Sequence, residues 1–508
     1  MTAASEEKLF ALWRELSDIS SASAVLEWDQ ETYMPSKGQE GRGRSLSTLA
    51  GIRHRLLTSP DLVDALSACE GIAEPDSELG AQCREARRSV DRASRVPEKL
   101  AKALAEATSQ GLACWQKARA ESDFSLFEES LSRIIELRRE QAEAIDSNRS
   151  AYDVLMDEFE PGATEAALAP VFENLCEQLS PLILEASESR PVDESPAMGD
   201  FPVAEQKAFG LFVAEKMGFD LEAGRLDATT HPFCSGFHPN DVRITWRHMD
   251  QDFRSALYGI MHEAGHGLYE QGLPAKWHGT PIGGAVSLGI HESQSRLWEN
   301  LVGRSHAFWK WALPHFTKYF PAKDGLTVDQ LWPALHTARP SLIRVEADEA
   351  TYNLHIAIRF DIERRLFAGD IAVADLPEAW DSAYEKFLGI RAETAAEGVL
   401  QDIHWSMGAF GYFPTYSLGN LIACQLFDAA ENEMDDLESM IAAGEFAPLR
   451  AWLGEKVHSH GARWSASELV QKATGQPLTA GPFLAYIRNI TSQAYGLENP
   501  SSSSGSRR

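Results

Sequence analysis

Hydrophobic residues recur at helical spacing along most of the chain. Residues 5–150 read as one helix after another, and helical patterns return near residues 164–185 and from about Glu292 onward. Pro35 is expected to end a helix and Pro97 to begin one, because proline fits a helix only in its first turn. The pattern therefore predicts a mainly α protein.

The best-defined helix is predicted from Asp250 to Gln271. Its apolar residues form one core-facing stripe: Phe253, Ala256, Leu257, Ile260, Met261, Ala264 and Leu268. Gly272 and Pro274 follow the stripe and end the helix. Gly265 and Gly267 each weaken a helix by about 1 kcal/mol relative to Ala. We expect close approach of another backbone, or of a substrate, to offset that cost.

The pattern changes between residues 225 and 248, where turn residues precede an alternating segment. Val242, Ile244 and Trp246 face one way there and polar residues the other, which predicts a strand. Residues 280–289 are a second candidate strand. A small β-sheet beside the 250–271 helix is therefore expected.

The length of 508 residues exceeds that of a usual domain, so two or three lobes are expected. Prolines and charged residues in 187–202 mark a boundary. This gives an N-terminal helical lobe at 1–190 and a second region at 191–498 that contains the 250–271 helix and the small sheet. The low-complexity residues 499–508 are predicted to be a disordered tail.

The chain is acidic, with 47 Lys and Arg against 75 Asp and Glu, for a net charge of −28. Such a charge argues against nucleic acid and anionic membranes as partners. The six cysteines are scattered without a Cys-x-x-Cys pair, which suits a reducing compartment. No secretory signal and no apolar run long enough to span a membrane are recognised. We therefore expect a cytoplasmic protein.

The predicted 250–271 helix contains the motif His-Glu-x-x-His, in which His262 and His266 are four residues apart. Both imidazoles can then face one metal ion from one side of the helix. Glu263 can reach a water on that ion and act as its base, which suits zinc. The alternative is two ordinary histidines on a helix, since so short a motif also arises by chance.

A catalytic zinc usually takes three protein ligands, so a third must be found. A metzincin would have a histidine six residues after His266, but Gly272 stands there. Glu292, on a following helix, would complete a His/His/Glu set of the gluzincin type. The rival ligands are His291 and Glu270.

Six stretches, in order, carry a resemblance to a known family: His231-Pro-Phe, Asp241-Val-Arg-Ile-Thr, His262-Glu-Ala-Gly-His, His291-Glu-Ser-Gln, Ile343-Arg-Val-Glu-Ala-Asp and Gly398-Val-Leu-Gln-Asp-Ile-His-Trp. The chain resembles the carboxypeptidase Taq family of zinc metallocarboxypeptidases over nearly its full length. The resemblance implies that His262, His266 and Glu292 hold the metal and that Glu263 is the catalytic base. It also implies a mainly helical, two-lobed gluzincin-type fold with a deep central groove, and a homodimer.

Catalysis also needs a donor to the developing oxyanion. The segment 404–416 offers His404, Tyr412 and Tyr416, of which we favour His404 and Tyr416 and assign Tyr412 to the substrate site. A ligand imidazole needs a partner on its second nitrogen, for which Asp348 and Glu346 are candidates.

A carboxypeptidase must recognise a free carboxylate, which a guanidinium does best. Arg344 and Arg243 are the candidates, and we favour Arg344. Either could instead be structural, paired with Asp348 or Asp241 respectively. Gln401 and Asp402 are assigned to the end of the substrate groove.

These expectations define a cytoplasmic zinc carboxypeptidase of broad specificity that acts on peptides, with cobalt as an acceptable substitute for zinc. One alternative is an endopeptidase or dipeptidase with the same site. Another is a non-catalytic, zinc-stabilised protein that binds peptides. The presence of Glu263 argues against the latter, because a structural zinc needs no base.

Overall fold

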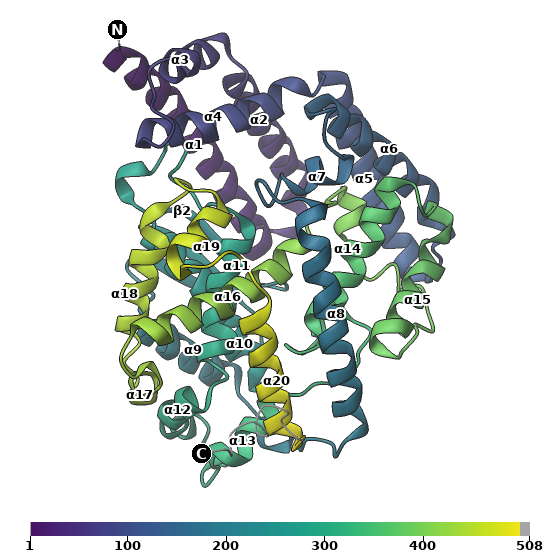
Figure 1. Cartoon of the computed structure of the whole chain (residues 1–508), viewed down its shortest axis with the longest axis vertical. Coiled ribbons are helices and arrows are strands. Elements are labelled where there is room, and N and C mark those ends of the chain that lie inside the picture. The colour runs from purple at the N-terminus through teal and green to yellow at the C-terminus, as the bar shows by residue number, and fades with distance from the viewer. Residues whose placement is uncertain (1, 498–508) are drawn as a thin grey trace, which may run out of the picture. The chain divides into compact units, whose positions relative to one another are not determined.

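The computed structural model describes residues 2–497, and twenty α-helices dominate this part of the chain (Figure 1). The mainly α prediction is confirmed. The first helix, α1, ends at Thr32, ahead of Pro35, and α5 begins directly after Pro97, as their prolines require. The expected tail at 499–508 lies outside the described residues.

The chain forms two compact units that interleave in sequence. Unit 1 comprises Met1–Arg95, Ala197–Val328 and Leu426–Leu478, and unit 2 comprises Val96–Pro196, Asp329–Gln425 and Thr479–Arg508. The expected boundary near residue 190 lies close to the passage from unit 2 to unit 1 at Pro196. The first 190 residues, expected as one lobe, are shared between both units.

Unit 1 contains the three-stranded sheet and eleven complete helices: α1 (Thr2–Thr32), α2 (Gln39–Leu57), α3 (Pro60–Glu70), α4 (Glu78–Arg95), α9 (Val203–Met217), α10 (Phe253–Gly272), α11 (Leu288–Arg296), α12 (His306–Tyr319), α17 (Leu437–Ala443), α18 (Ala447–Lys456) and α19 (Ala466–Thr474). Unit 2 contains seven: α5 (Glu98–Glu121), α6 (Ser125–Ile145), α7 (Ala151–Met156), α8 (Glu165–Glu188), α14 (Tyr352–Ala368), α15 (Leu376–Leu388) and α20 (Gly481–Tyr495). Helices α13 (Val328–Leu335) and α16 (Pro414–Glu433) run from one unit into the other.

The sheet has the strand order β1-β3-β2, with β1 at Gly224–Ala228, β2 at Cys234–His238 and β3 at Asp241–Trp246. Strand β3 pairs in parallel with β1 and antiparallel with β2. The strand predicted at 242–246 is confirmed. The candidate at 280–289 is wrong, because Pro281 and two glycines turn the backbone there until α11 begins.

Helix α10 occupies the predicted position, between the N-cap Asp252 and Gly272. Every residue of the predicted apolar stripe is buried. Strands β2 and β3 and helices α9 and α11 all contact α10, so it lies in the core of unit 1 (Figure 1). The motif His-Glu-x-x-His is therefore carried by a helix fixed on several sides.

Gly265 and Gly267 of α10 both mark close approaches, as expected. A Cβ atom on Gly265 would lie 2.7 Å from the carbonyl oxygen of Gln294 and 2.7 Å from the Cα atom of Ser295. A Cβ atom on Gly267 would lie 2.6 Å from the Phe219 ring. Glycine at 265 thus allows the backbones of α10 and α11 to touch.

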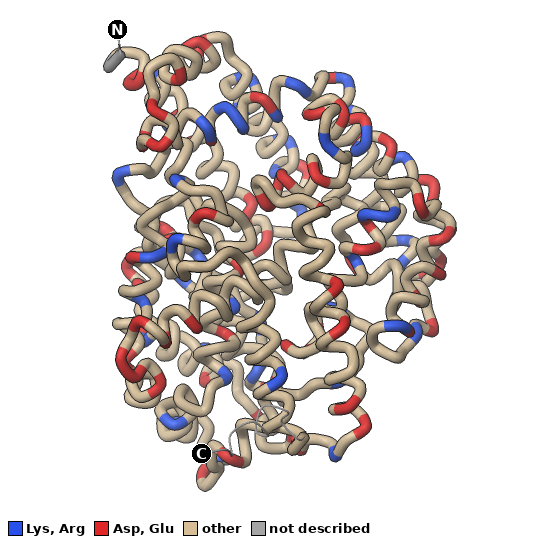
Figure 2. Tube along the Cα trace, viewed as in Figure 1, with Lys and Arg blue, Asp and Glu red and all other residues tan. Residues whose placement is uncertain are grey.

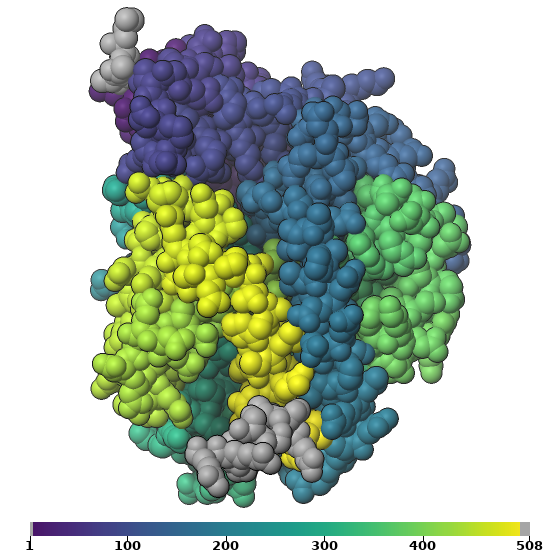
Figure 3. All heavy atoms as spheres, in the orientation of Figure 1, coloured from purple at the N-terminus to yellow at the C-terminus, as the bar shows by residue number. Residues whose placement is uncertain are grey.

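Unit 2 is built from long helices. Helix α8 lies beside α20 and also contacts α14 (Figures 1 and 3). The α8–α14 contact includes a stacked pair of rings, Phe172 and Phe360, with centroids 4.6 Å apart. Helices α5 and α6 form a second long pair. This packing places α14, which carries Arg359, in the core of unit 2.

Acidic and basic residues are interspersed along the helices of both units, and acidic residues are the more numerous (Figure 2). Within residues 2–497, no helix is long and apolar enough to cross a bilayer. All six cysteines are free thiols.

We predict that Gly265→Ala lowers the free energy of unfolding by about 1–3 kcal/mol, because the added methyl group forces α10 and α11 apart. Gly259→Ala is the matched control, since that glycine lies in the same helix and its Cβ would meet nothing within 4 Å. The control should gain up to about 1 kcal/mol from helix propensity. Urea unfolding measures both, and equal stability of the two variants would contradict the close-packing interpretation.

Candidate metal centre and associated sites

Three predicted side chains converge in unit 1. Glu292 Oε2 on α11 lies 3.5 Å from His262 Nε2 and 3.4 Å from His266 Nε2 on α10. The three ligand atoms all lie within 4.8 Å of one another, which fits a single metal ion. Two imidazoles and one carboxylate are the donor set of a catalytic zinc site with an open position.

Hydrogen bonds fix the orientation of both imidazoles. His262 Nδ1 lies 2.9 Å from Glu299 Oε2, and His266 Nδ1 lies 3.0 Å from the carbonyl oxygen of His291. With protons on both Nδ1 atoms, the Nε2 lone pairs are directed towards Glu292. The expectation that Asp348 or Glu346 supports a ligand histidine is wrong, because the Glu299 carboxylate and the His291 carbonyl group fill that role.

Glu299 was not identified from the sequence. It lies seven residues after Glu292, and the helix changes to a π-helix over Leu297–Val302. A period of 3.6 residues cannot place a side chain correctly across such a change, which often occurs at functional sites. The available signal was a second acidic residue two turns beyond the expected ligand.

Two arginines, Arg296 and Arg304, keep the carboxylates of Glu292 and Glu299 ionised. Arg296 lies 2.7 Å from Glu292 Oε1 and 3.1 Å from Glu299 Oε2, and Arg304 lies 3.3 Å from Glu299 Oε1. Burial acts to raise both carboxyl pKa values, but Arg296 and the neighbouring histidine and arginine side chains together outweigh it, so the pKa of Glu299 falls to about 2 and that of Glu292 lies well below its usual range. Burial lowers the pKa of His266 to about 3, so that imidazole is neutral, as a metal ligand must be.

Glu263 is buried beside this cluster, with 5% of its surface exposed. Its Oε2 atom has no hydrogen-bond partner among the described residues. Burial raises the pKa of Glu263 to about 7. A buried carboxylate oxygen without a partner is costly, and a water on a neighbouring metal ion would satisfy it. The residues present therefore fit a catalytic divalent ion.

The rival third ligands pair with each other instead. His291 Nε2 lies 2.8 Å from Glu270 Oε1. The His291 ring also stacks on His266, with centroids 4.4 Å apart. Both residues therefore support the metal-binding side chains, and Glu292 is the acid that completes the set.

Unit 2 contains a separate buried network around Asp402. Arg344 Nε donates to Asp402 Oδ1 at 2.9 Å, and Arg359 Nε donates to Asp402 Oδ2 at 2.6 Å. Gln401 Oε1 accepts from the Arg344 backbone N–H at 3.0 Å and from Arg359 Nη2 at 2.8 Å. Arg344 is thus paired with Asp402 rather than with Asp348, the partner considered from the sequence.

The residues assigned to the oxyanion and the substrate lie next to this network. Tyr416 Oη is 3.5 Å from His404 Nε2, and the His404 ring lies 5.2 Å from that of Tyr412. Burial lowers the pKa of His404 to about 4, so the imidazole is neutral near pH 7. A neutral imidazole and a phenol can both donate a hydrogen bond. The roles assigned to His404, Tyr412 and Tyr416 stay predictions.

Arg243 belongs to unit 1, on strand β3. It pairs with Asp241 at 3.0 Å, and its guanidinium lies 4.3 Å from the centroid of the Trp28 ring. Its side chain is therefore engaged in a local ion pair and a cation–π contact. Its role as a carboxylate ligand stays a prediction.

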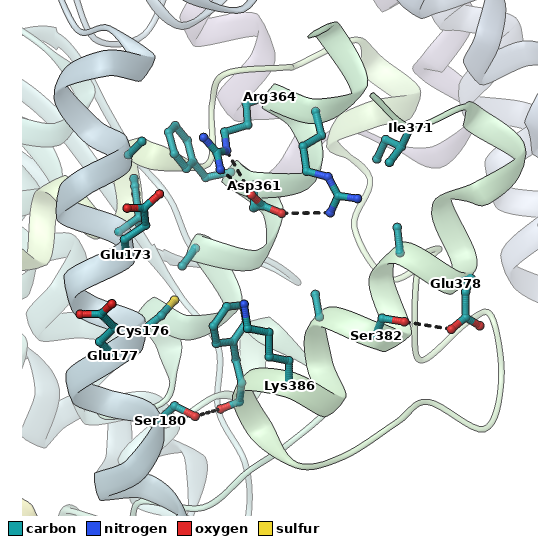
Figure 4. A pocket seen from close by; sticks show the side chains of 18 of the residues that line it. Glu173, Cys176, Glu177, Ser180, Asp361, Arg364, Ile371, Glu378, Ser382 and Lys386 are labelled. Atoms are coloured by element: carbon teal, nitrogen blue, oxygen red, sulfur yellow. Dashed lines mark hydrogen bonds and ion pairs between the residues drawn. The ribbon is translucent and has the colours of Figure 1, made fainter. Parts of the chain in front are cut away.

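Unit 2 also has a cavity of about 970 Å³ between α8, α14 and α15. Asp361 pairs with Arg364 at 3.0 Å and with Arg365 at 3.2 Å in this cavity, and Ser382 donates a hydrogen bond to Glu378 at 2.9 Å. Figure 4 shows these side chains lining the cavity. The buried Cys176 thiol has its pKa raised to about 12 by burial, so it is unreactive. We assign this cavity no ligand.

A helix bearing His-Glu-x-x-His with a glutamate from the next helix defines the gluzincin class of metal-dependent hydrolase sites. Residues 8–491 match the carboxypeptidase Taq (M32) metallopeptidase family. The chain belongs to that family, and it is a metallocarboxypeptidase.

Relatives with this activity match almost end to end. Thermostable carboxypeptidase 1 of Thermus thermophilus is 42% identical over 97% of this chain and 99% of its own length. Carboxypeptidase 1 of Bacillus subtilis is 37% identical over 96% of this chain and 98% of its own. The crystal structure of an M32 carboxypeptidase from Deinococcus radiodurans R1 has a TM-score of 0.93 and 39% identity, covering 97% of this chain and all of that one.

We predict that Glu299→Ala weakens metal binding by about 10- to 100-fold, because His262 loses the partner that fixes its ring. Glu299→Gln should lose less, since its amide oxygen can still accept from Nδ1. Competition with a chelator, read out as bound metal, measures both. Wild-type affinity in Glu299→Ala would show that the contact is dispensable.

Proposed function

We propose that this metallocarboxypeptidase uses zinc, bound by His262, His266 and Glu292, to remove residues one at a time from peptide C-termini. Glu263 is its general base. The observation that carries this proposal is the buried, unpartnered carboxylate oxygen of Glu263 beside three converging metal-ligand atoms. A purely structural metal site would need no such group.

When bound, the divalent ion supplies Lewis acidity, which polarises the scissile carbonyl and lowers the pKa of a coordinated water. Glu263 takes the proton of the attacking water on Oε2 and passes it to the nitrogen of the leaving amine. Burial raises the pKa of Glu263, which favours the protonated form that delivers the proton to the leaving amine. Arg296 keeps Glu292 ionised, and Glu299 keeps His262 in the required tautomer.

Recognition of the terminal carboxylate is assigned to Arg344. Two buried guanidiniums, those of Arg344 and Arg359, share the single carboxylate of Asp402. His404 is neutral, and Glu363, one turn along α14 from Arg359, has its pKa raised by burial to about 7, so it offsets the surplus only in part. A buried surplus of positive charge is costly, and a bound carboxylate would relieve it.

The remaining assignments are also proposals. We infer broad specificity for peptide substrates. We also infer that cobalt can replace zinc, because two imidazoles and a carboxylate bind either ion. The cytoplasmic location and the homodimer stay predictions. Metal analysis and reconstitution of the apoprotein with each ion test the choice of metal. Sedimentation of the purified protein tests the homodimer.

We predict that Glu263→Gln retains its metal but loses at least about 100-fold in kcat, because an amide cannot accept the proton. Bound zinc is to be quantified in the same preparation that is assayed. Near wild-type kcat with full metal occupancy would remove Glu263 from the mechanism.

We predict that amidation of the peptide C-terminus abolishes cleavage of an otherwise good substrate, because Arg344 then has no carboxylate to bind. Mass spectrometry of the products compares the free and amidated peptides. Internal cleavage of the amidated peptide would identify an endopeptidase instead, with the same metal centre.

A further inference from the structure

We propose that Arg359 is a positioning residue that, through Asp402 and Gln401, holds the Arg344 guanidinium in the orientation needed for the substrate carboxylate. The inference rests on the role proposed above for Arg344. Arg359 lies outside the six sequence stretches and belongs to unit 2, whereas the metal ligands belong to unit 1.

Arg359 is fully buried, with 0% of its surface exposed, so it cannot itself contact a substrate. Each of its nitrogens is engaged. Nε donates to Asp402 at 2.6 Å, Nη2 donates to Gln401 at 2.8 Å, and Nη1 donates to the carbonyl oxygen of His355 at 2.8 Å and to Tyr384 Oη at 3.1 Å. Such a forked set of bonds requires a planar guanidinium.

The first link to Arg344 is Asp402, whose two oxygens are divided between the arginines. Oδ2 faces Arg359, whereas Oδ1 accepts from Nε of Arg344 at 2.9 Å and lies 2.9 Å from its Nη2 atom in the same ion pair. Without Arg359, Oδ2 would be a buried anionic oxygen that has lost its partner. The Asp402 carboxylate would then rotate or shift to find another donor, and the Arg344 guanidinium would move with it.

The second link is Gln401, which ties the backbone that carries Arg344. Its Oε1 atom accepts from Arg359 and from the Arg344 N–H, while its Nε2 atom donates to the carbonyl oxygens of Leu342 at 3.0 Å and Glu397 at 2.8 Å. All its polar atoms therefore serve the chain itself. On this inference Gln401 positions Arg344, in place of the substrate contact expected from the sequence.

Of the two arginines, Arg344 is the more exposed and is therefore the one proposed to bind the substrate carboxylate. Its side chain is 6% exposed, against 0% for Arg359. Its other side-chain hydrogen bond runs from Nη1 to the phenol oxygen of Tyr352 at 3.1 Å, and the guanidinium lies 5.1 Å from the centroid of the Tyr416 ring. A carboxylate is a stronger acceptor for a guanidinium than a phenol is, so substrate can compete for this donor.

A double-mutant cycle on the zinc-loaded enzyme tests the inference, with Arg344→Ala, Arg359→Met and the double variant assayed on one peptide with a free C-terminus. We expect each single variant to raise KM by about 10- to 100-fold with kcat changed far less. The double variant should match Arg344→Ala, because Arg359 acts only through Arg344. Additive effects on KM, or an unchanged KM in Arg359→Met, would overturn the inference.

The failure modes are separable. If Arg344→Ala leaves KM unchanged, the carboxylate role of Arg344 and the present inference fall together, whereas additivity overturns the inference alone.

Gln401→Met, which keeps both buried charges, should also raise KM, and it replaces Arg359→Met in the cycle if that variant does not fold. Arg359→Lys should fold, and its KM should lie between that of the wild type and that of Arg359→Met. Arg365→Met is the matched control, because this half-buried arginine of the same helix pairs with Asp361 instead of Asp402, and it should leave KM, kcat and bound zinc unchanged.

Discussion

The contact on which the metal centre depends is the approach of the α10 and α11 backbones at Gly265. Any side chain there would meet Gln294 and Ser295, so the absence of a Cβ sets the distance between the two helices. At that distance Glu292 reaches both imidazoles of α10. The helix thus accepts a residue of low propensity in its middle because the site requires the close approach.

Electrostatic balance is the second constraint, and the two units satisfy it in opposite ways. In unit 1, three buried acids, Glu263, Glu292 and Glu299, stand against two arginines, Arg296 and Arg304. Once Glu263 is ionised, one carboxylate charge is left unbalanced, and a divalent ion would balance it. In unit 2, the cationic groups are in excess around one carboxylate. Each site is therefore charged oppositely to the ligand proposed for it, a metal cation in one and a peptide carboxylate in the other.

The sequence was most informative where the chemistry is local. The spacing of His262 and His266, the stripe of α10 and the glycine at 265 all follow from the helical period, and Glu292 followed from the known need for a third ligand. Glu299 could not be placed, because a π-helix interrupts the period between it and Glu292. The strand expected at 280–289 failed because small apolar residues between turn residues resemble a strand without the pairing partner that makes one.

The partners of Arg344 show a further limit. Its neighbour in sequence, Asp348, was the natural candidate for an ion pair, yet the pair is made with Asp402, 58 residues away, and is shared with Arg359. Periodicity cannot reveal such contacts, because the tertiary fold of unit 2 determines which charged groups are buried together. The general rule that buried charges are paired does require a buried guanidinium to have an anionic partner. Where two guanidiniums share one aspartate, that requirement is left incompletely met within the chain, and the substrate carboxylate proposed for Arg344 would complete the charge balance.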